Sequence, residues 1–178
     1  MTPRYRAVWS SRRLQVRIGT HIPLLTVALL LASCTAILTP MYGVREGQLA
    51  PCPSNRDCMS SSDTDPARYI APLIYTGTRA RASSDLLQAI NAVGQARIVS
   101  NHRNYLRVEY PISNPAERAA QYYYQPANAV DDVEFYLVPE RHVIEIRSIA
   151  QLGLFDVGAN RARLEQIRSA FEKLQQQH

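Results

Sequence analysis

The stretch that decides the fold is VEFYLVPERHVIEIRS, which spans Val133 to Ser148. Two runs with alternating side chains flank the turn sequence PERH, and this pattern is typical of a β-hairpin. Pairing the two valines beside the turn places Phe135 opposite Ile146 on the face expected to be buried. The same register places Glu134 opposite Arg147 on the other face, where opposite charges form a favourable cross-strand pair.

Further strands and helices are predicted on both sides of this hairpin. RIVS and YLRVEY alternate around the turn sequence NHRN, and two stretches carry apolar residues at helical spacing. The predicted elements are strands at 97–100 and 105–110 and helices at 84–94 and 160–174, with Ser84 and Asn160 as candidate N-caps. This order predicts an α+β fold, in which a small antiparallel sheet of about four strands carries helices packed on one face.

The N-terminal residues have the composition of an export signal. Residues 1–33 hold five arginines and no acidic residue, and the apolar run Ile22–Ala32 is eleven residues long. Such a run spans only about half of a ~30 Å hydrocarbon core. The run ends in LASC, which resembles the bacterial lipobox, where a peptidase cuts before a cysteine that carries diacylglycerol. We therefore expect a cleaved signal peptide at 1–33 and a lipid on Cys34; the alternative is an uncleaved membrane anchor with an incidental cysteine.

Removing this leader changes the charge of the chain. The full sequence has 20 Lys and Arg against 15 Asp and Glu, and the loss of five leader arginines leaves 15 of each sign. A neutral chain lacks the basic surface that phosphate binding needs, so we expect no nucleic-acid partner. Thr35 follows the cysteine, where an Asp would commonly signal retention in the inner membrane. We therefore expect a lipid-anchored protein of the cell envelope, on the outer membrane and facing the periplasm.

Besides Cys34, the mature chain holds two cysteines, Cys52 and Cys58. In an oxidising compartment an even pair predicts a disulfide, whereas redox-active pairs usually lie closer together at a helix start. No His or further Cys lies near them in the sequence, so we expect no metal site. The prolines and weak periodicity around the pair indicate a lipidated tether with a disulfide loop at 34–66, followed by a single domain at 67–178.

One local rule is broken at the start of the last predicted helix. Arg161 and Arg163 lie in its first turn, where the helix dipole favours carboxylates. Acidic residues are available before the hairpin and before the helix, so we expect the arginines to pair with them. The candidate polar cluster contains Asp131, Asp132, Glu134, Arg147, Ser148, Asp156, Asn160, Arg161 and Arg163. Such a cluster is either a structural ion-pair network or a functional site.

Three sequence blocks carry a resemblance to a known family. They are PCPSNRDCMSS, VDDVEFYL and IRSIAQLGLFDVGANRARLEQIR, and together they resemble the bacterial family called domain of unknown function 1499. The resemblance runs from about Leu49 to Arg168 and implies an envelope lipoprotein or a membrane-anchored protein. It implies no known activity, cofactor or catalytic residue. Ala150 and Gln151 stand where the family pattern has a Ser and an Arg.

No standard catalytic constellation is evident, so we expect a binding or scaffolding protein and no cofactor. Asp131 and Asp132 are adjacent, and adjacent strand residues point to opposite faces. One alternative is an envelope hydrolase that uses Asp132, Asp156 and Arg161. Another is a carrier of a small apolar ligand in a tyrosine-lined cavity between sheet and helices. Carboxylates neutralised by arginines would favour structure, and a closed cavity would favour the carrier.

Overall fold

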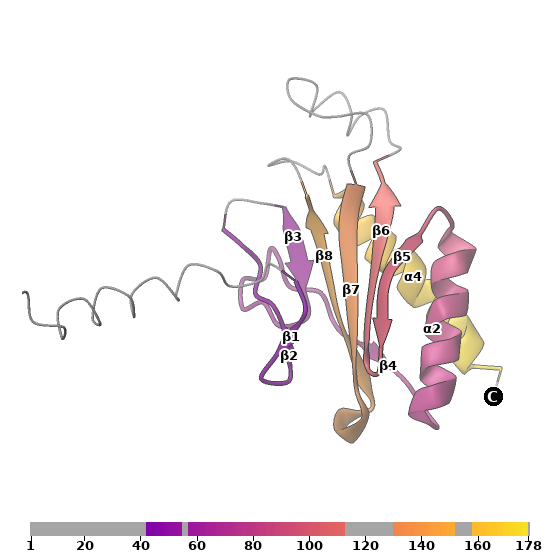
Figure 1. The fold of residues 1–178 in the computed structure, drawn as a ribbon. Helices are drawn as coiled ribbons and strands as arrows, with labels where there is room; N and C mark the ends of the chain where they lie inside the picture. Colours follow the sequence, from indigo (N-terminus) through magenta and orange to yellow (C-terminus); the bar gives the residue numbers. More distant parts are fainter. Residues whose placement is uncertain (1–41, 55–56, 113–129, 152–157, 178) are drawn as a thin grey trace, which may run out of the picture. The chain divides into compact units, whose positions relative to one another are not determined.

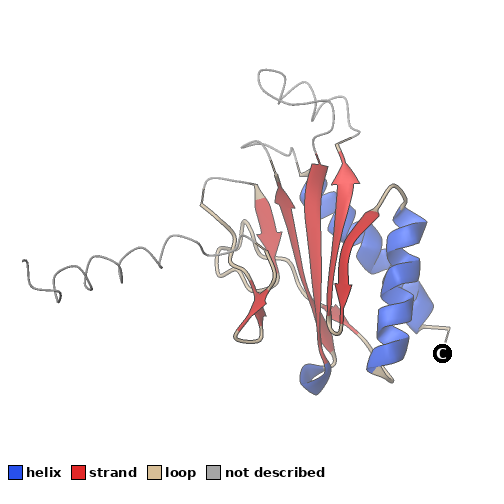
Figure 2. Cartoon of the chain, in the orientation of Figure 1, coloured by secondary structure: helices blue, strands red, loops and turns tan. Residues whose placement is uncertain are grey.

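The computed structural model describes residues 42–54, 57–112, 130–151 and 158–177 (Figure 1). A twisted sheet carries two helices on the same side, as Figure 2 shows in red and blue. The six-stranded sheet has the order β3-β8-β7-β6-β5, and β4 also pairs with β8. The strands are β3 (Cys58–Ser60), β4 (Leu73–Ile74), β5 (Arg97–His102), β6 (Tyr105–Pro111), β7 (Val130–Val138) and β8 (Val143–Ala150), and the helices are α2 (Arg79–Val93) and α4 (Ala159–Gln175).

The predicted α+β fold is confirmed, and all strand pairings of the sheet are antiparallel. The sheet has six strands, where about four were predicted. The difference lies in β3 and β4, which pair with opposite ends of the same edge of β8. Strands of two and three residues are too short to show alternation in the sequence.

The central hairpin has the predicted register. Phe135 pairs with Ile146, and Glu134 pairs with Arg147. The turn is a single 3-10 turn at Pro139–Arg141, where the proline ring fixes the backbone angle at the first turn position. The alternation of apolar and polar residues along β7 and β8 therefore predicted the register of this hairpin correctly.

Helix α2 begins earlier than predicted. Its N-cap is Thr78, whose hydroxyl accepts a hydrogen bond from the Arg81 N–H at 3.2 Å. The predicted cap Ser84 lies inside the helix, and the following Asp85 is buried and accepts a hydrogen bond from Gln175 Nε2 at 2.7 Å. The predicted end at Gly94 is confirmed, because its N–H closes the last turn on Ile90 O at 3.2 Å with a φ of 85°.

The hydrophobic core lies between the sheet and the two helices. Apolar side chains that alternate along β6, β7 and β8 face the apolar stripes of α2 and α4. The core includes Leu86, Ile90, Leu106, Val108, Val133, Phe135, Ile144, Ile146, Leu164, Ile167 and Phe171. This packing places the first turn of α4 beside one end of the sheet, where the candidate polar residues lie.

The opposite face of the sheet is covered in part by a small hairpin that precedes β3. Its strands are β1 (Val44–Arg45) and β2 (Gln48–Leu49), and the turn residues Glu46 and Gly47 both have positive φ, as a two-residue type I′ turn requires. Leu49 and Ala50 are buried. The backbone N–H of Gly43 donates to the Glu134 carboxylate at 2.7 Å, which fixes the hairpin to β7.

Part of the segment that we expected to be a tether, 34–66, carries strands that pack on the sheet. Its described residues form β1, β2 and β3, and Cys58 pairs with Ile149 of β8. The predicted disulfide between Cys52 and Cys58 is confirmed. The expected signal peptide and Cys34 lie outside the described residues. Among the residues described, no helix is long and apolar enough to cross a membrane.

Candidate functional site

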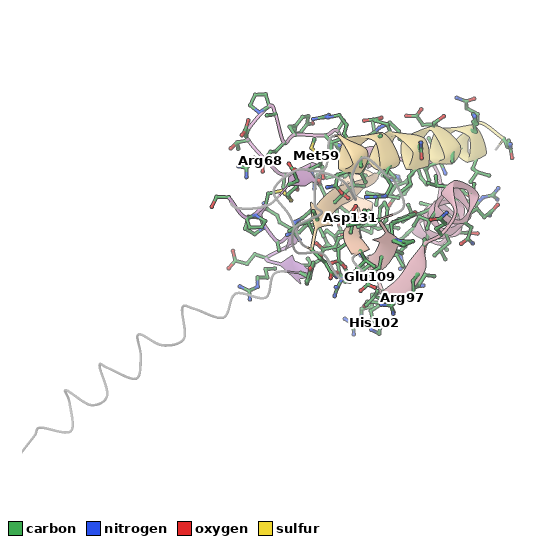
Figure 3. All side chains as sticks on the ribbon, turned by 90° about the horizontal axis from the view of Figure 1, so that it is seen from above. Met59, Arg68, Arg97, His102, Glu109 and Asp131 are labelled. Atoms are coloured by element: carbon green, nitrogen blue, oxygen red, sulfur yellow. A yellow bond between two sulfur atoms is a disulfide. The ribbon has the colours of Figure 1, made fainter. Side chains whose placement is uncertain are left out.

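The sheet divides the predicted polar cluster into two groups. Asp131 and Asp132 are neighbours in β7 and point to opposite faces, as predicted from strand geometry. Asp131 faces α4 and contacts Arg163, whereas Asp132 faces away and contacts Arg107 of β6. Figure 3 looks down on the molecule from above and shows Asp131 between α4 and Glu109, which lies on the side away from that helix. The candidate cluster is thus not one site.

The helix-face group joins β7 and β8 to the first turn of α4. Asp131 is 2% exposed, and its Oδ2 accepts from Arg163 Nη2 at 2.8 Å. Arg163 also donates through Nη1 to Asn160 Oδ1 at 3.1 Å, and the same oxygen accepts from the Ser148 hydroxyl. Asn160 is buried and lies in the first turn of α4. The N-cap of this helix is Gly158, so the predicted N-cap Asn160 was wrong. Asp131 supplies a negative charge beside the first turn of a helix that has no acidic residue there.

Arg161 occupies a different position from the one predicted. Its guanidinium donates to the carbonyl oxygens of Ala67 at 3.2 Å and Tyr69 at 3.1 Å, and it lies 3.9 Å from the sulfur of Met59. These contacts join α4 to the segment after β3. Asp132 lies on the far side of the sheet, so the two do not form the hydrolase cluster that the sequence suggested. The third member of that cluster, Asp156, lies outside the described residues.

A chain of charges crosses the face of the sheet opposite the helices. Asp132 is fully buried; its Oδ1 accepts from Arg107 Nε at 2.7 Å and its Oδ2 from Gln151 Nε2 at 2.7 Å. Arg107 Nη2 also lies 3.8 Å from Glu109, which contacts Arg97 of the edge strand. The sequence prediction missed Arg97, Arg107 and Glu109, although the alternation of YLRVEY already placed Arg107 and Glu109 on the polar face.

Glu134 and Arg147 form a second buried pair on this face. Both side chains are 0% exposed, and Arg147 Nη1 donates to Glu134 Oε2. Glu134 Oε1 accepts from the Tyr105 hydroxyl at 2.7 Å and from the Gly43 N–H at 2.7 Å. Burial, with the charge of Glu134, raises the pKa of Tyr105, so this hydroxyl keeps the proton that it donates.

The ring of Tyr42 covers the arginines of this face. It lies 3.8 Å from the guanidinium carbon of Arg107 and 6.0 Å from that of Arg147. A guanidinium over an aromatic face is attracted by the ring quadrupole, and the contact strengthens where water is excluded. Tyr42 and Gly43 therefore bind the N-terminal segment to the charged face, and this contact explains why the predicted pair of Glu134 and Arg147 is buried.

Tyr110 gives a pH-dependent test of the helix-face group. It is 4% exposed, its hydroxyl has no hydrogen-bond partner among the described residues, and its ring lies 5.1 Å from the guanidinium carbon of Arg163. Burial raises its pKa from the ordinary 10.0 to about 12, and Arg163 opposes the shift. The unfolded chain therefore loses this proton first. The contribution of Tyr110 to stability is complete below pH 10 and is lost as the pH rises through about 12.

We expect Tyr110→Phe to remove one late-titrating phenol from the folded protein. Tyrosinate absorbance, recorded against pH for both proteins under conditions where they stay folded, should differ by one group that titrates near pH 12. The variant should also be as stable as the parent or more stable at pH 7, because it removes a buried hydroxyl that has no partner. A difference spectrum that titrates near the ordinary value of 10.0 would contradict this assignment.

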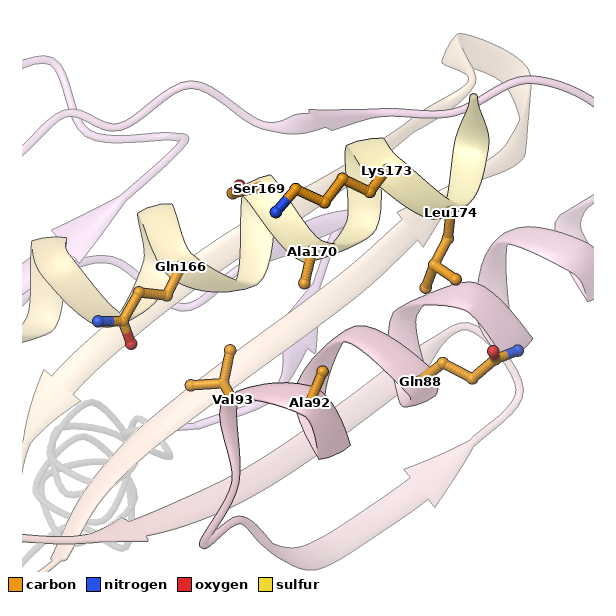
Figure 4. A pocket seen from close by; sticks show the side chains of 8 residues that line it. All are labelled: Gln88, Ala92, Val93, Gln166, Ser169, Ala170, Lys173 and Leu174. Carbon is orange, nitrogen blue, oxygen red and sulfur yellow. The ribbon is translucent and has the colours of Figure 1, made fainter. Parts of the chain in front are cut away.

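The groove between α2 and α4 does not have the lining expected of the apolar carrier site. The groove in Figure 4 lies between the outer surfaces of α2 and α4 and has a volume of about 660 Å³. It is lined by Gln88, Ala92, Val93, Gln166, Ser169, Ala170, Lys173 and Leu174. None of these is a tyrosine, and the groove is not enclosed between sheet and helices. Among the described residues, no group of three or more His, Cys, Asp or Glu is placed to hold a metal ion.

Comparison with known proteins gives the family. The family model described as a protein of unknown function (DUF1499) matches residues 48–171. The chain belongs to the DUF1499 family. The match runs from β2 to Phe171 in α4, so the DUF1499 region includes both polar groups and the disulfide. No curated protein and no solved structure matches this chain.

Proposed function

We propose that this DUF1499 protein is a lipid-anchored protein of the cell envelope that has a non-catalytic binding or scaffolding role at the periplasmic face of the outer membrane. The observation that carries the non-catalytic part is the pairing of its buried carboxylates. Asp131, Asp132 and Glu134 each contact an arginine. A carboxylate that forms an ion pair with a guanidinium is poorly suited to act as a base or a nucleophile, because its charge is already neutralised.

The sequence before residue 42 supports the anchor. A basic leader, a short apolar run and LASC are together the pattern of a bacterial lipoprotein signal, and the cysteine is the residue that would carry the lipid. The confirmed disulfide is consistent with this proposal, since disulfides persist mainly in oxidising compartments. A single acyl chain binds membranes only marginally, so stable attachment requires the several chains of a mature bacterial lipoprotein.

We expect Cys34→Ser to abolish lipid attachment. The variant should remain unprocessed or become soluble, and it should not incorporate labelled palmitate. Ser33→Ala is the matched control, because it keeps a small residue before the thiol and should be lipidated normally. Cell fractionation and intact mass of both variants give the answer. Normal processing and unchanged membrane attachment of Cys34→Ser would exclude the proposed lipid anchor.

A further inference from the structure

A second groove lies on the face of the sheet opposite the helices, at the turn end of the central hairpin. Its volume is about 460 Å³, within the range of small-molecule sites. Its lining residues come from the β1–β2 hairpin, from the segment after β3 and from the turn end of β7 and β8. None of its lining residues belongs to the charge pairs described above.

Glu145 is the buried charged residue among those that line this groove. It is 7% exposed, one carboxylate oxygen accepts from the Ser61 hydroxyl, and the other contacts Arg141 Nη2. Ser61 Oγ is itself fixed, because it accepts from the Ile146 N–H at 2.9 Å. A carboxylate offers about four lone-pair positions, so these two contacts leave Glu145 able to accept further hydrogen bonds from a ligand.

Arg141 also lines the groove. Its side chain is 56% exposed, and Glu145 is its ion-pair partner within the described part of the chain. A guanidinium has five N–H donors in a planar fork, and the contact with Glu145 uses Nη2 alone. The remaining donors can bind a second carboxylate, a geometry that guanidinium groups favour.

The lining carries two carboxylates, Glu46 and Glu145, against one guanidinium, Arg141. A purely anionic ligand would meet an excess of negative charge, and an apolar ligand would leave the polar wall without partners. We propose that this groove binds a small zwitterion of the free dipeptide class, with its ammonium group toward Glu46 and Glu145 and its carboxylate on Arg141. This proposal rests on the binding role proposed above and names a ligand class for it.

The test uses alanyl-alanine as the probe and the full mature chain in detergent micelles. Backbone amide shifts of Gly47, Ser62 and Glu145 should change saturably on titration. Two matched ligands isolate the two charges: N-acetyl-alanyl-alanine lacks the ammonium group, and alanyl-alanine amide lacks the carboxylate. Each should bind about tenfold more weakly or worse, since each loses a hydrogen bond to a charged group.

Arg141→Gln should weaken alanyl-alanine binding by about tenfold or more while the protein stays folded, because the replaced side chain is largely exposed. Arg103→Gln, in the exposed turn between β5 and β6, is the matched control and should bind as the parent does. The proposal is overturned if alanyl-alanine causes no saturable shift, if the blocked ligands bind equally well, or if Arg141→Gln binds unchanged. None of these results affects membrane attachment through Cys34, so they are distinct from a failure of the proposed anchor.

Discussion

Replacing Arg147 with methionine is expected to lower the free energy of unfolding by about 3–5 kcal/mol, because it leaves Glu134 buried without its arginine. Methionine fills much of the space of the arginine stem, so the loss reports the missing charge more than a cavity. Tyr105 and Gly43 would still donate to the carboxylate, but neither donor carries a charge. For a domain of this size the melting temperature should fall by roughly 10–20 °C.

Arg97→Ala is the control for this prediction, because it removes an arginine from the same face of the sheet. Its side chain is 70% exposed, and its partner Glu109 also lies near Arg107. An exposed ion pair contributes about 0–1 kcal/mol, so the control should melt within a few degrees of the parent. Circular dichroism against temperature and urea measures both variants. Equal stability of Arg147→Met and the parent would refute the structural role of the buried pair.

The second large effect is expected in the first turn of α4. Arg163→Ala removes the guanidinium that contacts Asp131 and Asn160, both of which are buried. We expect it to lower the free energy of unfolding by about 3 kcal/mol. Arg161→Ala is the matched change two residues earlier in the same turn. Arg161 is exposed, and its replacement removes hydrogen bonds to two backbone carbonyls. We expect this change to lower the free energy of unfolding by about 1 kcal/mol.

Urea unfolding of the two alanine variants separates these contributions. The order of the two losses is the informative result, since both variants lose one positive charge from a helix N-terminus and gain equally from the dipole. If Arg161→Ala were the more destabilised variant, the contact of Arg163 with Asp131 would not be the principal connection between α4 and β7.

The sequence predicted those parts of the fold that long regular elements define. Strands β7 and β8 are long enough for alternation to fix their register, and Glu134 was correctly paired with Arg147. The burial of that pair was not predictable in the same way. It depends on Tyr42 and Gly43, which lie about ninety residues earlier in the chain and belong to a hairpin with two-residue strands.

The candidate site was predicted less completely than the fold. Strand alternation correctly separated Asp131 from Asp132, but it could not show that Arg107 contacts Asp132, since this contact depends on how β6 pairs with β7. Arg161 was expected among the carboxylates because of the helix dipole. Its binding of the carbonyls of Ala67 and Tyr69 depends on the path of a segment without regular structure. Local rules identified an unusual helix start, and only the tertiary contacts identified the partners.

The side-chain amide of Gln151 also donates to Asp132, at 2.7 Å. Asp132 therefore has one charged and one neutral donor from Arg107 and Gln151. These two contacts support the view that Asp132 belongs to a charge network in the fold.

The most direct test of the proposal that the buried carboxylates of this protein are neutralised by arginines is a double-mutant cycle on Glu134 and Arg147. Glu134→Gln keeps the acceptor for Tyr105 and Gly43, and Arg147→Met removes the guanidinium. If the two side chains neutralise each other, the double variant should be more stable than Arg147→Met alone, with a coupling free energy of about 2 kcal/mol or more in urea unfolding. Additive losses, with no coupling, would show that the buried carboxylate is not neutralised by this arginine and would contradict the proposal of a closed, non-catalytic charge network.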